Sequence, residues 1–432
     1  MNEHTTALIT AYAVNPYKGS EDGSGWNIIW HLAHQVDVIA ITRCNNAAAI
    51  QRFMAEHALP PGRKLQWLYF DLPTWMRFWK KGARGAMLYH YLWHLGVVFF
   101  ILRRRLRFDV AHHLNFHNDW TPSFLWLLRK PLIWGPIGHH HKIPTEFLRP
   151  YGRKAWLRDR LLWWTKWAFW RFDPFLKITR SSARKILCMN SSVRAVLPIP
   201  EHKHVLLPPT ASERAGRMVE VRKPGFTVLS VGRFVPLKGF DVTVRAFARF
   251  YRERRPEEQK CLRLVLIGRG PCERAICGSG PADEGLPADA VEFIPWIERS
   301  QLAYYYATAS AFLFPSHEGA GMVVVEAMSY GLPVLCFKNY GPGEFTDDSC
   351  AIRVPYGEYD ACLEAFARGL HLLFEHPALQ QTMGAAARKR FEQLYTYDHK
   401  ARTIAALYAQ VLERGKAAAG AGVAMAAPQR AE

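Results

Sequence analysis

Apolar runs alternate with polar, glycine-containing turns along the first half of the chain. Ala7–Val14 predicts a strand, Lys18–Gly25 a loop, Trp26–His34 a helix and Val36–Ile41 a second strand. This order is typical of a βαβ unit and therefore of a parallel sheet. Later apolar runs predict further strands of the same layer at Asp109–His113, Pro131–Trp134 and Leu187–Asn190.

The same alternation starts again after a polar, proline-containing stretch at Leu207–Pro224. Short apolar runs predict strands at Phe226–Val231, Leu262–Ile267, Val291–Ile294, Ala311–Phe314 and Pro333–Phe337. Helical patterns follow them at Gly239–Tyr251, Ser300–Ala307, Gly321–Tyr330, Tyr359–Phe374 and Ala378–Leu394. We therefore predict an α/β fold with two Rossmann-like, doubly wound parallel-sheet domains.

The domain boundaries follow from these patterns. We place an N-terminal domain with basic-aromatic insertions at residues 1–210 and a C-terminal domain at 222–395. Residues 396–414 predict a helix that packs back toward the N-terminal domain. The Ala/Gly-rich residues 415–432 predict a disordered tail.

Charge and aromatic content narrow the range of ligands. The 432 residues carry a net charge of +19 and include 15 Trp. Such an excess of Lys and Arg attracts anions, whether nucleic acid, lipid headgroups or phosphorylated small molecules. Residues 75–107 and 156–171 interleave cations with aromatic residues, as helices that bind anionic membranes do. The alternative for each segment is a helix that packs on its own domain and has a solvated basic face.

Cysteine spacing and terminal composition favour a cytoplasmic protein. The eight Cys are scattered and lack the spacing of a disulfide framework or a zinc site. Met1–Thr6 has no basic region of the kind that opens a signal peptide. The longest apolar stretch, Leu92–Leu102, falls short of the ~20 residues that a membrane-spanning helix needs. We expect no membrane-crossing segment.

Candidate chemistry lies at the ends of the predicted strands in the second half. Gly232 and Arg233 follow the first of these strands, and Lys238 opens the next helix. Arg offers a planar fork of donors and Lys a point charge, which together suit a departing diphosphate. Gly268 and Gly270 form a similar turn after the next strand. The alternative for either cation is a solvated surface residue.

A third strand end combines glycines with two carboxylates. Glu318 lies in the loop before a predicted helix, and Glu326 lies within that helix. Gly319 and Gly321 leave backbone N–H groups available at the helix start, which favours anion binding. Carboxylates beside an anion site suit a ligand that carries hydroxyls and phosphates. A sugar nucleotide is such a ligand.

Three stretches carry a family resemblance. They are Gly-Arg-Phe-x3-Lys-Gly-x-Asp from Gly232, Ile-Gly-x-Gly-Pro from Ile267 and Pro-Ser-x-Glu-Gly-x-Gly-x4-Glu-Ala from Pro315. The chain resembles the retaining glycosyltransferases of family 4 (glycosyl transferases group 1), most strongly over 226–355. The resemblance implies the GT-B fold, in which two Rossmann-like domains face each other across a cleft.

The resemblance also implies roles for individual residues. Arg233 and Lys238 would hold the donor diphosphate and stabilise its departing charge. Glu326 would bind the ribose hydroxyls, and Glu318 would lie against the donor sugar. Gly343-Glu344-Phe is similar to the family's following loop, whose amides approach the sugar and phosphate.

The N-terminal half is similar to the same family over shorter stretches. Gly19–Trp26, with Gly23 and Gly25, resembles a glycine loop that closes over the donor. Phe108–His113 resembles a strand end that carries an active-site His, so His113 is the catalytic candidate and His112 an acceptor-binding one. Trp134–Gly138 also matches, but His139-His140-His141 stand where relatives often have glycines. We expect His139 to contact the acceptor.

The implied activity is transfer of a hexose from a nucleotide-diphosphate donor, such as a UDP- or GDP-sugar, to a hydroxyl with retention (EC 2.4). Because no Asp-x-Asp pair is present and consecutive His side chains cannot all face one ion, we expect no metal cofactor. The expected acceptor is lipid-linked, as in bacterial surface-polysaccharide assembly, and the protein is expected at the inner face of the cytoplasmic membrane. A nucleic-acid or membrane binder without transferase activity and a GT-B epimerase are the alternatives. We expect no nucleic-acid partner, because two carboxylates at the main site would repel phosphates.

Overall fold

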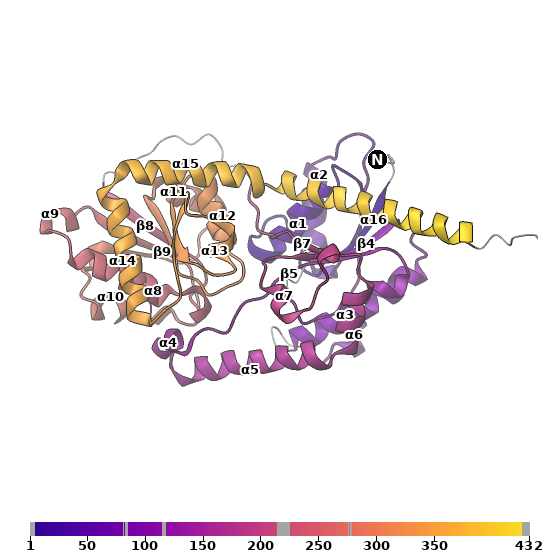
Figure 1. Cartoon of the computed structure of the whole chain (residues 1–432), viewed down its shortest axis with the longest axis horizontal. Coiled ribbons are helices and arrows are strands. Elements are labelled where there is room, and N and C mark those ends of the chain that lie inside the picture. The colour runs from indigo at the N-terminus through magenta and orange to yellow at the C-terminus, as the bar shows by residue number, and fades with distance from the viewer. Residues whose placement is uncertain are drawn as a thin grey trace, which may run out of the picture. The chain divides into compact units, whose positions relative to one another are not determined.

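The computed structural model describes residues 5–80, 82, 85–114, 118–213, 225–274, 276 and 279–425. The chain divides into two compact units (Figure 1). Unit 1 comprises Met1–Gly138, Ala168–Pro209 and Tyr397–Glu432, and unit 2 comprises His139–Trp167 and Thr210–Thr396. Each unit contains one sheet of parallel strands, of seven strands in unit 1 and six in unit 2. The predicted α/β class with two parallel-sheet domains is confirmed.

The sheet of unit 1 has the strand order β3-β2-β1-β4-β5-β6-β7. The strands are β1 (Thr6–Thr10), β2 (Asp37–Thr42), β3 (Leu65–Tyr69), β4 (Val110–His113), β5 (Leu132–Ile137), β6 (Lys185–Cys188) and β7 (His204–Leu206). The pattern of apolar runs did not predict the two edge strands, β3 and β7. Both edge strands are only partly buried, so their apolar signal is weak.

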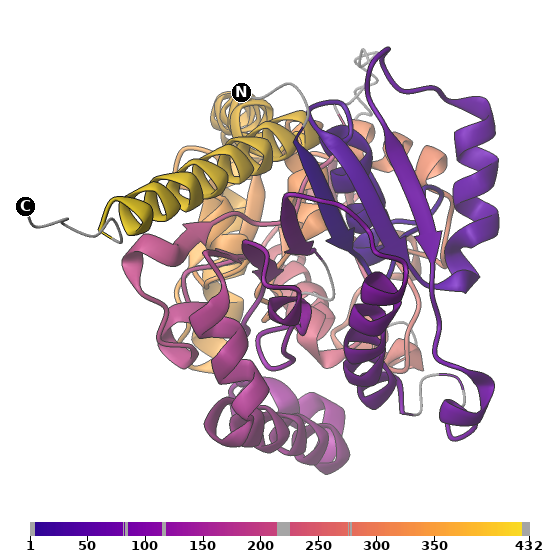
Figure 2. The same ribbon diagram turned by 90° about the vertical axis from the view of Figure 1, so that its right-hand side faces the viewer.

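Helices cover both faces of this sheet. They are α1 (Ser20–Leu32), α2 (Ala47–Glu56), α3 (Ala86–Arg103), α6 (Pro174–Ser182), α7 (Val193–Val196) and α16 (Tyr397–Met425). Successive residues of a strand point to opposite faces. Accordingly His112 meets Tyr408 of α16 on one face, whereas His113 stacks on His94 of α3 on the other. Figure 2 shows α16 beside the strands of unit 1.

The predicted glycine loop at Lys18–Gly25 is wrong in its bounds. Helix α1 begins at Ser20, so Gly23 and Gly25 lie inside its first turns. Glu21 and Asp22 in the first turn complement the positive end of the helix dipole. A Cβ at Gly23 would lie 2.2 Å from the backbone O of Lys18, so this glycine is needed for close backbone packing. Whether Gly23 and Gly25 bind a donor stays a prediction.

Helix α3 is long and apolar enough, by length and composition alone, to cross a membrane. It is the one such helix among the described residues, and 39% of its 18 residues are buried within the structure. Its Trp93, Val97 and Ile101 belong to the apolar core of unit 1. Because the core helix of a domain passes the same test, the length of α3 is weak evidence for a membrane span.

The sheet of unit 2 has the order β10-β9-β8-β11-β12-β13. The strands are β8 (Phe226–Val231), β9 (Leu262–Ile267), β10 (Val291–Ile294), β11 (Ala311–Phe314), β12 (Val334–Phe337) and β13 (Ala351–Val354). The helices are α4 (Thr145–Leu148), α5 (Gly152–Phe172), α8 (Phe240–Arg252), α9 (Pro256–Gln259), α10 (Ser279–Asp283), α11 (Arg299–Thr308), α12 (Met322–Ser329), α13 (Pro342–Phe345), α14 (Tyr359–Glu375) and α15 (Pro377–Leu394). The division between the units falls inside α5.

Residues 139–167, which we expected in the N-terminal domain, cluster with unit 2. Phe147 of α4 is buried in the core formed by the sheet, α8 and α14. The Tyr151 hydroxyl donates to Asp241 Oδ1 at 2.7 Å, and the Tyr359 hydroxyl donates to Asp241 Oδ2 at 2.8 Å. Glu146 accepts from the Tyr359 backbone N–H at 3.1 Å. A buried aromatic ring and a half-buried carboxylate therefore tie this segment to unit 2.

The C-terminal helix clusters with unit 1 and is longer than the predicted 396–414. Its start is joined to α1 through His31, whose Nδ1 lies 2.7 Å from Asp398 Oδ1. We expected residues 415–432 to be disordered, but α16 continues to Met425, as the high helix propensity of alanine favours. Residues 426–432 lie outside the described residues, as does the part of the predicted domain boundary between 210 and 222 that begins at residue 214.

Candidate functional site

Three loops follow neighbouring strands of unit 2 and are joined by hydrogen bonds at the carboxyl edge of the sheet. The Ser316 hydroxyl donates to the backbone O of Leu237 at 3.1 Å, and the His317 N–H donates to the same oxygen at 2.9 Å. The Asn339 amide donates to the Ser316 backbone O at 2.8 Å. The loops after β8, β11 and β12 thus form one surface, where parallel α/β sheets bind ligands.

Lys238 and Glu318 meet on this surface although 80 residues separate them. The Lys238 ammonium donates to both Glu318 oxygens, at 2.6 and 2.7 Å, and lies 5.1 Å from the Phe314 ring centroid. The two side chains are only 18% and 15% exposed. Gly239 makes this approach possible: its φ is +67°, and a Cβ there would lie 2.0 Å from the Pro315 backbone O.

The glycines after β8 and β9 have a packing role that the structure makes explicit. A Cβ at Gly268 would lie 1.9 Å from the Gly232 backbone O, and one at Gly270 would lie 2.3 Å from the Phe234 backbone O. The loop after β9 therefore needs glycine to approach the loop that carries Arg233. Donor contact by Gly232, Gly268 and Gly270 stays a prediction.

Arg233 is exposed at the end of β8. Its guanidinium makes no hydrogen bond or ion pair with any residue that the structure describes, whereas the backbone O of Arg233 accepts from the Val235 N–H at 2.8 Å. The backbone of the loop is thus held while all five guanidinium N–H donors face solvent or a ligand. The structure brings Lys238 and Glu318 together, whereas the Arg233 guanidinium has no hydrogen-bond or ion-pair partner among the described residues.

The loop that carries Glu318 leads into α12, whose first turn offers backbone N–H groups. Gly319 and Gly321 are buried, and the N–H groups of Met322 and Val323 precede the first bond within the helix, from Val324 N to Gly321 O at 3.0 Å. Unpaired donors at a helix start favour anions. Further along α12, Glu326 accepts from the Tyr306 hydroxyl at 3.2 Å, so this half-buried carboxylate has the partner that its apolar surroundings require.

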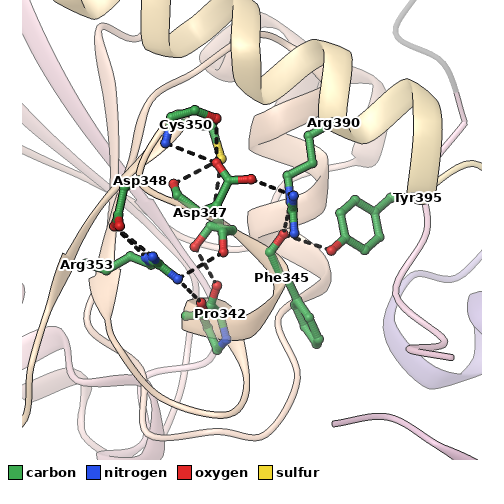
Figure 3. A network of polar contacts seen from close by, with 11 residues as sticks. Pro342, Phe345, Asp347, Asp348, Cys350, Arg353, Arg390 and Tyr395 are labelled. Atoms are coloured by element: carbon green, nitrogen blue, oxygen red, sulfur yellow. Dashed lines mark hydrogen bonds and ion pairs between the residues drawn. The ribbon is translucent and has the colours of Figure 1, made fainter. Parts of the chain in front are cut away.

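Helix α13 contains Glu344, and a network of polar contacts holds the backbone of this helix (Figure 3). Arg390 donates to the Phe345 backbone O at 2.7 Å, and the Tyr395 hydroxyl donates to the same oxygen at 2.8 Å. Arg353 donates to the Gly343 backbone O at 3.2 Å. Three donors on two carbonyls of so short a helix fix the position of the Gly343-Glu344 turn.

His317 lies under this surface beside Phe337 and Tyr356, whose rings stack on each other 4.3 Å apart and are nearly parallel to the imidazole. Its Nδ1 lies 2.8 Å from the Tyr356 hydroxyl, and burial lowers the pKa of His317 to about 3. A neutral imidazole at this point supports the loop that carries Glu318 without adding charge.

The predicted site residues of unit 1 are buried. His112 is fully buried, and its two ring nitrogens lie 2.6 Å from the Tyr408 hydroxyl and 2.7 Å from the Gly135 backbone O. Burial lowers the pKa of His112 to about 4. With both nitrogens engaged inside its own unit, His112 has no polar atom left for an acceptor, so its predicted acceptor contact is not supported. His113 is 4% exposed, and its catalytic role stays a prediction.

The three consecutive histidines belong to unit 2. His139 is 1% exposed and packs edge-on against Trp163, 5.6 Å between ring centroids. The His140 Nε2 lies 3.4 Å from the Lys166 ammonium, and burial lowers the pKa of His140 to about 3. Because His139 is buried beside α5, an acceptor contact would need a rearrangement of this segment, and that contact stays a prediction.

Among the described residues, one group of side chains has ligand atoms close enough together to hold a metal ion. It consists of His90, His94 and His113, whose nitrogens lie within 4.8 Å of one another. The His94 and His113 rings stack at 4.0 Å and 17°. Two nearly parallel imidazoles do not direct their in-plane lone pairs at one point. The prediction of a metal-independent protein stays a prediction.

Residues 217–390 match the family model of glycosyl transferases group 1. The match lies within unit 2 and includes every predicted donor residue from Gly232 to Glu344. The D-inositol 3-phosphate glycosyltransferase of Streptomyces coelicolor is 34% identical over 195 residues, which cover 43% of this chain and 40% of the relative. The D-inositol 3-phosphate glycosyltransferase of Acidothermus cellulolyticus is 37% identical over 173 residues, 38% of each chain. The chain thus spans less than half the length of these relatives.

Solved glycosyltransferases share the fold over nearly the whole chain. Sucrose-phosphate synthase from Thermosynechococcus elongatus has a TM-score of 0.64 at 19% identity and covers 95% of this chain and 100% of its own. HepE from Anabaena, solved in complex with UDP, has a TM-score of 0.61 at 14% identity and covers 94% and 100%. At this identity the likeness establishes the architecture, and the predicted GT-B fold is confirmed.

Sequence patterns missed the residues that hold the site in place. Ser316 and Asn339 join the loops, Tyr306 partners Glu326, and Arg353 and Arg390 support α13. Ser316 and Asn339 each follow closely after a predicted strand, so their positions at strand ends were a usable signal. Arg390 lies 45 residues from its partner Phe345, and no local pattern predicts such a contact.

Proposed function

We propose that the chain is a glycosyltransferase that moves a hexose from a nucleoside-diphosphate donor to a hydroxyl, with retention at the anomeric carbon. The contact between Lys238 and Glu318 at the carboxyl edge of unit 2 carries this proposal. It sets a cation and a carboxylate side by side at the start of a helix whose first N–H groups favour an anion. The match of 217–390 to glycosyl transferases group 1 supports it independently.

In this proposal the donor diphosphate is held by two cations. An ammonium has three N–H donors, and Glu318 takes two of those of Lys238, which leaves one for a phosphate oxygen. Arg233 supplies the planar fork, since none of its donors is committed to a described residue. The UDP bound in HepE supports a nucleoside diphosphate as the ligand class.

The carboxylates and the α13 turn select the rest of the donor. Glu326, already hydrogen-bonded to Tyr306, accepts from the ribose hydroxyls, and Glu318 accepts from the hydroxyls of the sugar. Glu344 and the Gly343 amide approach the sugar and phosphate from the rigid turn that Arg353 and Arg390 support.

The chemical step breaks the bond between the anomeric carbon and the phosphate oxygen and forms a bond from that carbon to the acceptor oxygen. The acceptor proton passes to the departing phosphate on the same face of the sugar, which gives retention. Because negative charge develops on the phosphate, fixed donors from Arg233, Lys238 and the start of α12 lower the barrier. No side-chain base and no metal ion take part in this scheme.

The acceptor in this proposal is lipid-linked and is reached from the cytoplasmic face of the membrane, as in surface-polysaccharide assembly. Helix α5 supports this part. It exposes Leu161 and Trp164 at 66% and 69%, together with the exposed Arg158 and Arg171. Exposed apolar side chains among cations match the headgroup layer of an anionic membrane.

A thermal-shift screen of the purified chain with UDP-, GDP- and ADP-sugars tests the proposed activity. A donor that binds only the folded protein raises Tm with concentration, by the mass-action relation between ligand and stability. We expect one base to raise Tm in wild type and to have no effect on Arg233→Ala. No shift with any of the three bases would contradict the proposal.

A further inference from the structure

A hollow of about 290 Å³ lies in unit 1, lined by Arg43, Thr74, Arg77, Phe78, Lys80 and Tyr89. Arg43 directly follows β2, and the residues from Thr74 to Lys80 follow β3. The hollow is therefore at the carboxyl edge of the unit 1 sheet. Ligands of open α/β sheets bind at this edge. No residue of the hollow belongs to the proposed donor site.

The charges around the hollow are unbalanced. Asp71 is the one carboxylate that pairs with its cations among the described residues: Arg43 Nε lies 3.1 Å from Oδ1, and Arg77 Nη1 lies 3.8 Å from Oδ2. Asp71 also accepts from the Tyr89 hydroxyl at 2.5 Å and from the Cys44 N–H at 3.2 Å. Both carboxylate oxygens of Asp71 therefore already have partners within the protein. The Lys80 ammonium has no ion pair with any described residue, so two positive charges stay uncompensated.

Aromatic rings hold these cations in place. The Arg43 guanidinium lies 4.9 Å from the Tyr12 ring centroid and 5.2 Å from that of Tyr89. The Lys80 ammonium lies 5.2 Å from the Tyr89 ring centroid. Cation–π contacts of this kind restrain side chains that would otherwise sample many rotamers. Cations that are fixed before binding lose less entropy when an anion arrives.

We propose that this hollow binds a phosphoryl group of the acceptor substrate. Three cations from two strand ends, with the Thr74 hydroxyl beside them, provide the charge and the multiple donors that a phosphate takes up. The inference rests on the proposed function, because it assigns the phosphate to the acceptor. The hollow places that anion in unit 1, whereas the cations for the donor diphosphate are in unit 2.

The phosphoryl group has two chemical sources, a membrane lipid and a soluble phosphorylated acceptor. Trp75 and Phe78 flank the cations and are 74% and 75% exposed. Aromatic side chains beside an anion site suit a lipid phosphate, because the apolar part of a lipid begins close to its charged headgroup. A soluble phosphorylated acceptor would use the cations alone.

Calorimetric titration with inorganic phosphate tests the site on the full chain. The variant is Arg77→Gln/Lys80→Gln, which keeps the Arg43–Asp71 pair intact. The matched control is Arg52→Gln, whose cation is 71% exposed in a helix ion pair with Glu56. We expect the phosphate Kd to rise at least about tenfold in the double variant, as the loss of ~1.4 kcal/mol or more requires, and to stay unchanged in the control. Equal phosphate affinity in wild type and double variant would overturn the proposal, as would the absence of phosphate binding to wild type.

Flotation with vesicles distinguishes the two sources. The vesicles contain phosphatidylcholine with or without phosphatidic acid, whose headgroup is a phosphomonoester. If the source is a lipid, phosphatidic acid retains wild type but neither the double variant nor Trp75→Ser/Phe78→Ser, and the last variant still binds inorganic phosphate. If the source is soluble, vesicles with phosphatidic acid retain the same fraction of all three proteins. The double variant still binds inorganic phosphate more weakly than wild type. Either outcome supports the phosphoryl site and assigns its source.

Nucleotide binding separates a failure of this inference from a failure of the proposed function. The double variant should bind the preferred nucleoside diphosphate with the wild-type Kd, because Arg233 and Lys238 are unchanged. Once an acceptor is identified, the KM of the double variant for that acceptor should rise at least about tenfold, while its kcat stays within about twofold of wild type. If wild type binds phosphate but no nucleotide, the result contradicts the donor assignment in unit 2 and still supports the phosphoryl site in unit 1.

Discussion

The two units use the same parallel-strand topology, but their carboxyl edges are built from different residue types. In unit 2 the edge consists of glycine turns that let three loops pack together, with one lysine–glutamate pair between them. In unit 1 the edge carries Arg43, Arg77 and Lys80, and Asp71 is the one carboxylate among the described residues that pairs with them. Aromatic rings contact Arg43 and Lys80.

The two edges also differ in whether the family model covers them. The segment 217–390 that matches glycosyl transferases group 1 lies within unit 2. In unit 2 the glycines and the Lys238–Glu318 pair stand in motifs that the sequence alone made visible. In unit 1 the cations of the edge stand in no such motif, and only the fold brings them together. The comparison teaches that motifs point to the proposed donor site, whereas the proposed acceptor site has to be argued from the structure.

The largest effect that sharpens this comparison is expected from the cations of unit 2. Lys238→Ala and Arg233→Ala should each reduce kcat/KM for transfer by about 10²–10³, the cost of removing one donor aimed at developing charge. Arg233→Ala breaks no side-chain hydrogen bond or ion pair to a described residue, so its Tm should stay at the wild-type value. The control is Lys260→Ala, an exposed lysine outside the loops of the edge. Near-normal transfer by both variants would remove these residues from the mechanism.

The next effect concerns the segment 139–167 that unit 2 holds. Asp241→Ala leaves the half-buried Tyr151 and Tyr359 hydroxyls without their acceptor, which should cost about 2–3 kcal/mol of unfolding free energy. Urea unfolding measures the loss, and hydrogen exchange should show faster opening of α4. Asp289→Ala, at an exposed carboxylate, is the control. Unchanged exchange in α4 would show that Phe147 alone anchors this segment.

A buried histidine in each unit makes both units sensitive to acid. The pKa is lowered to about 4 for His112 and to about 3 for His317, whereas a His in an unfolded chain titrates near pH ~6.5. Below that pH the unfolded chain binds more protons, so each group's contribution to stability is complete above pH ~6.5 and is lost as pH falls toward the folded pKa. Between pH ~7.5 and ~5, each should contribute a loss of about 2 kcal/mol.

Urea unfolding at those two pH values measures the loss in wild type, His112→Asn and His317→Asn. Each variant should show a smaller drop in unfolding free energy than wild type. The same drop in all three proteins would mean that other groups set the acid sensitivity.

The smallest effect concerns the membrane contact proposed for α5. Trp164→Ser should weaken flotation with phosphatidylglycerol vesicles about tenfold, since a side chain 69% exposed would be withdrawn from the headgroup layer. Trp296→Ser is a matched control, because Trp296 is 70% exposed on unit 2 outside α5. Equal losses in the two variants would point to general hydrophobic adsorption and not to a defined contact of α5.

The sequence predicted the fold of unit 2 closely, and the reason is local. Strands β8, β9 and β11 have the predicted bounds because each is a short, mostly buried apolar run between polar turns. Strand β10 also has the predicted bounds although it is only partly buried, and the edge strand β13 was not predicted. Unit 1 was harder. The edge strand β3 is only partly buried, and the glycines near residue 20 suggested a loop where acidic residues start a helix.

The site was predictable in its residue types but not in its supports. Lys238 and Glu318 were named from strand ends, and the structure places them 2.6 Å apart. The acceptor contact of His112 stays a prediction that the structure does not support, because the alternation along β4 turns His112 toward α16 and His113 toward α3. The contacts of Asp241 with Tyr151 and of Arg390 with α13 join distant segments that only the folded chain brings together.

A crystal structure of the chain with a bound nucleoside diphosphate tests the central claim most directly. We expect the diphosphate oxygens within about 2.7–3.2 Å of donors on Arg233, Lys238 and the start of α12, with the ribose hydroxyls at Glu326. A nucleotide bound with full occupancy elsewhere in the chain, with Arg233 and Lys238 in solvent, would contradict the assignment of the carboxyl edge of unit 2 as the donor site.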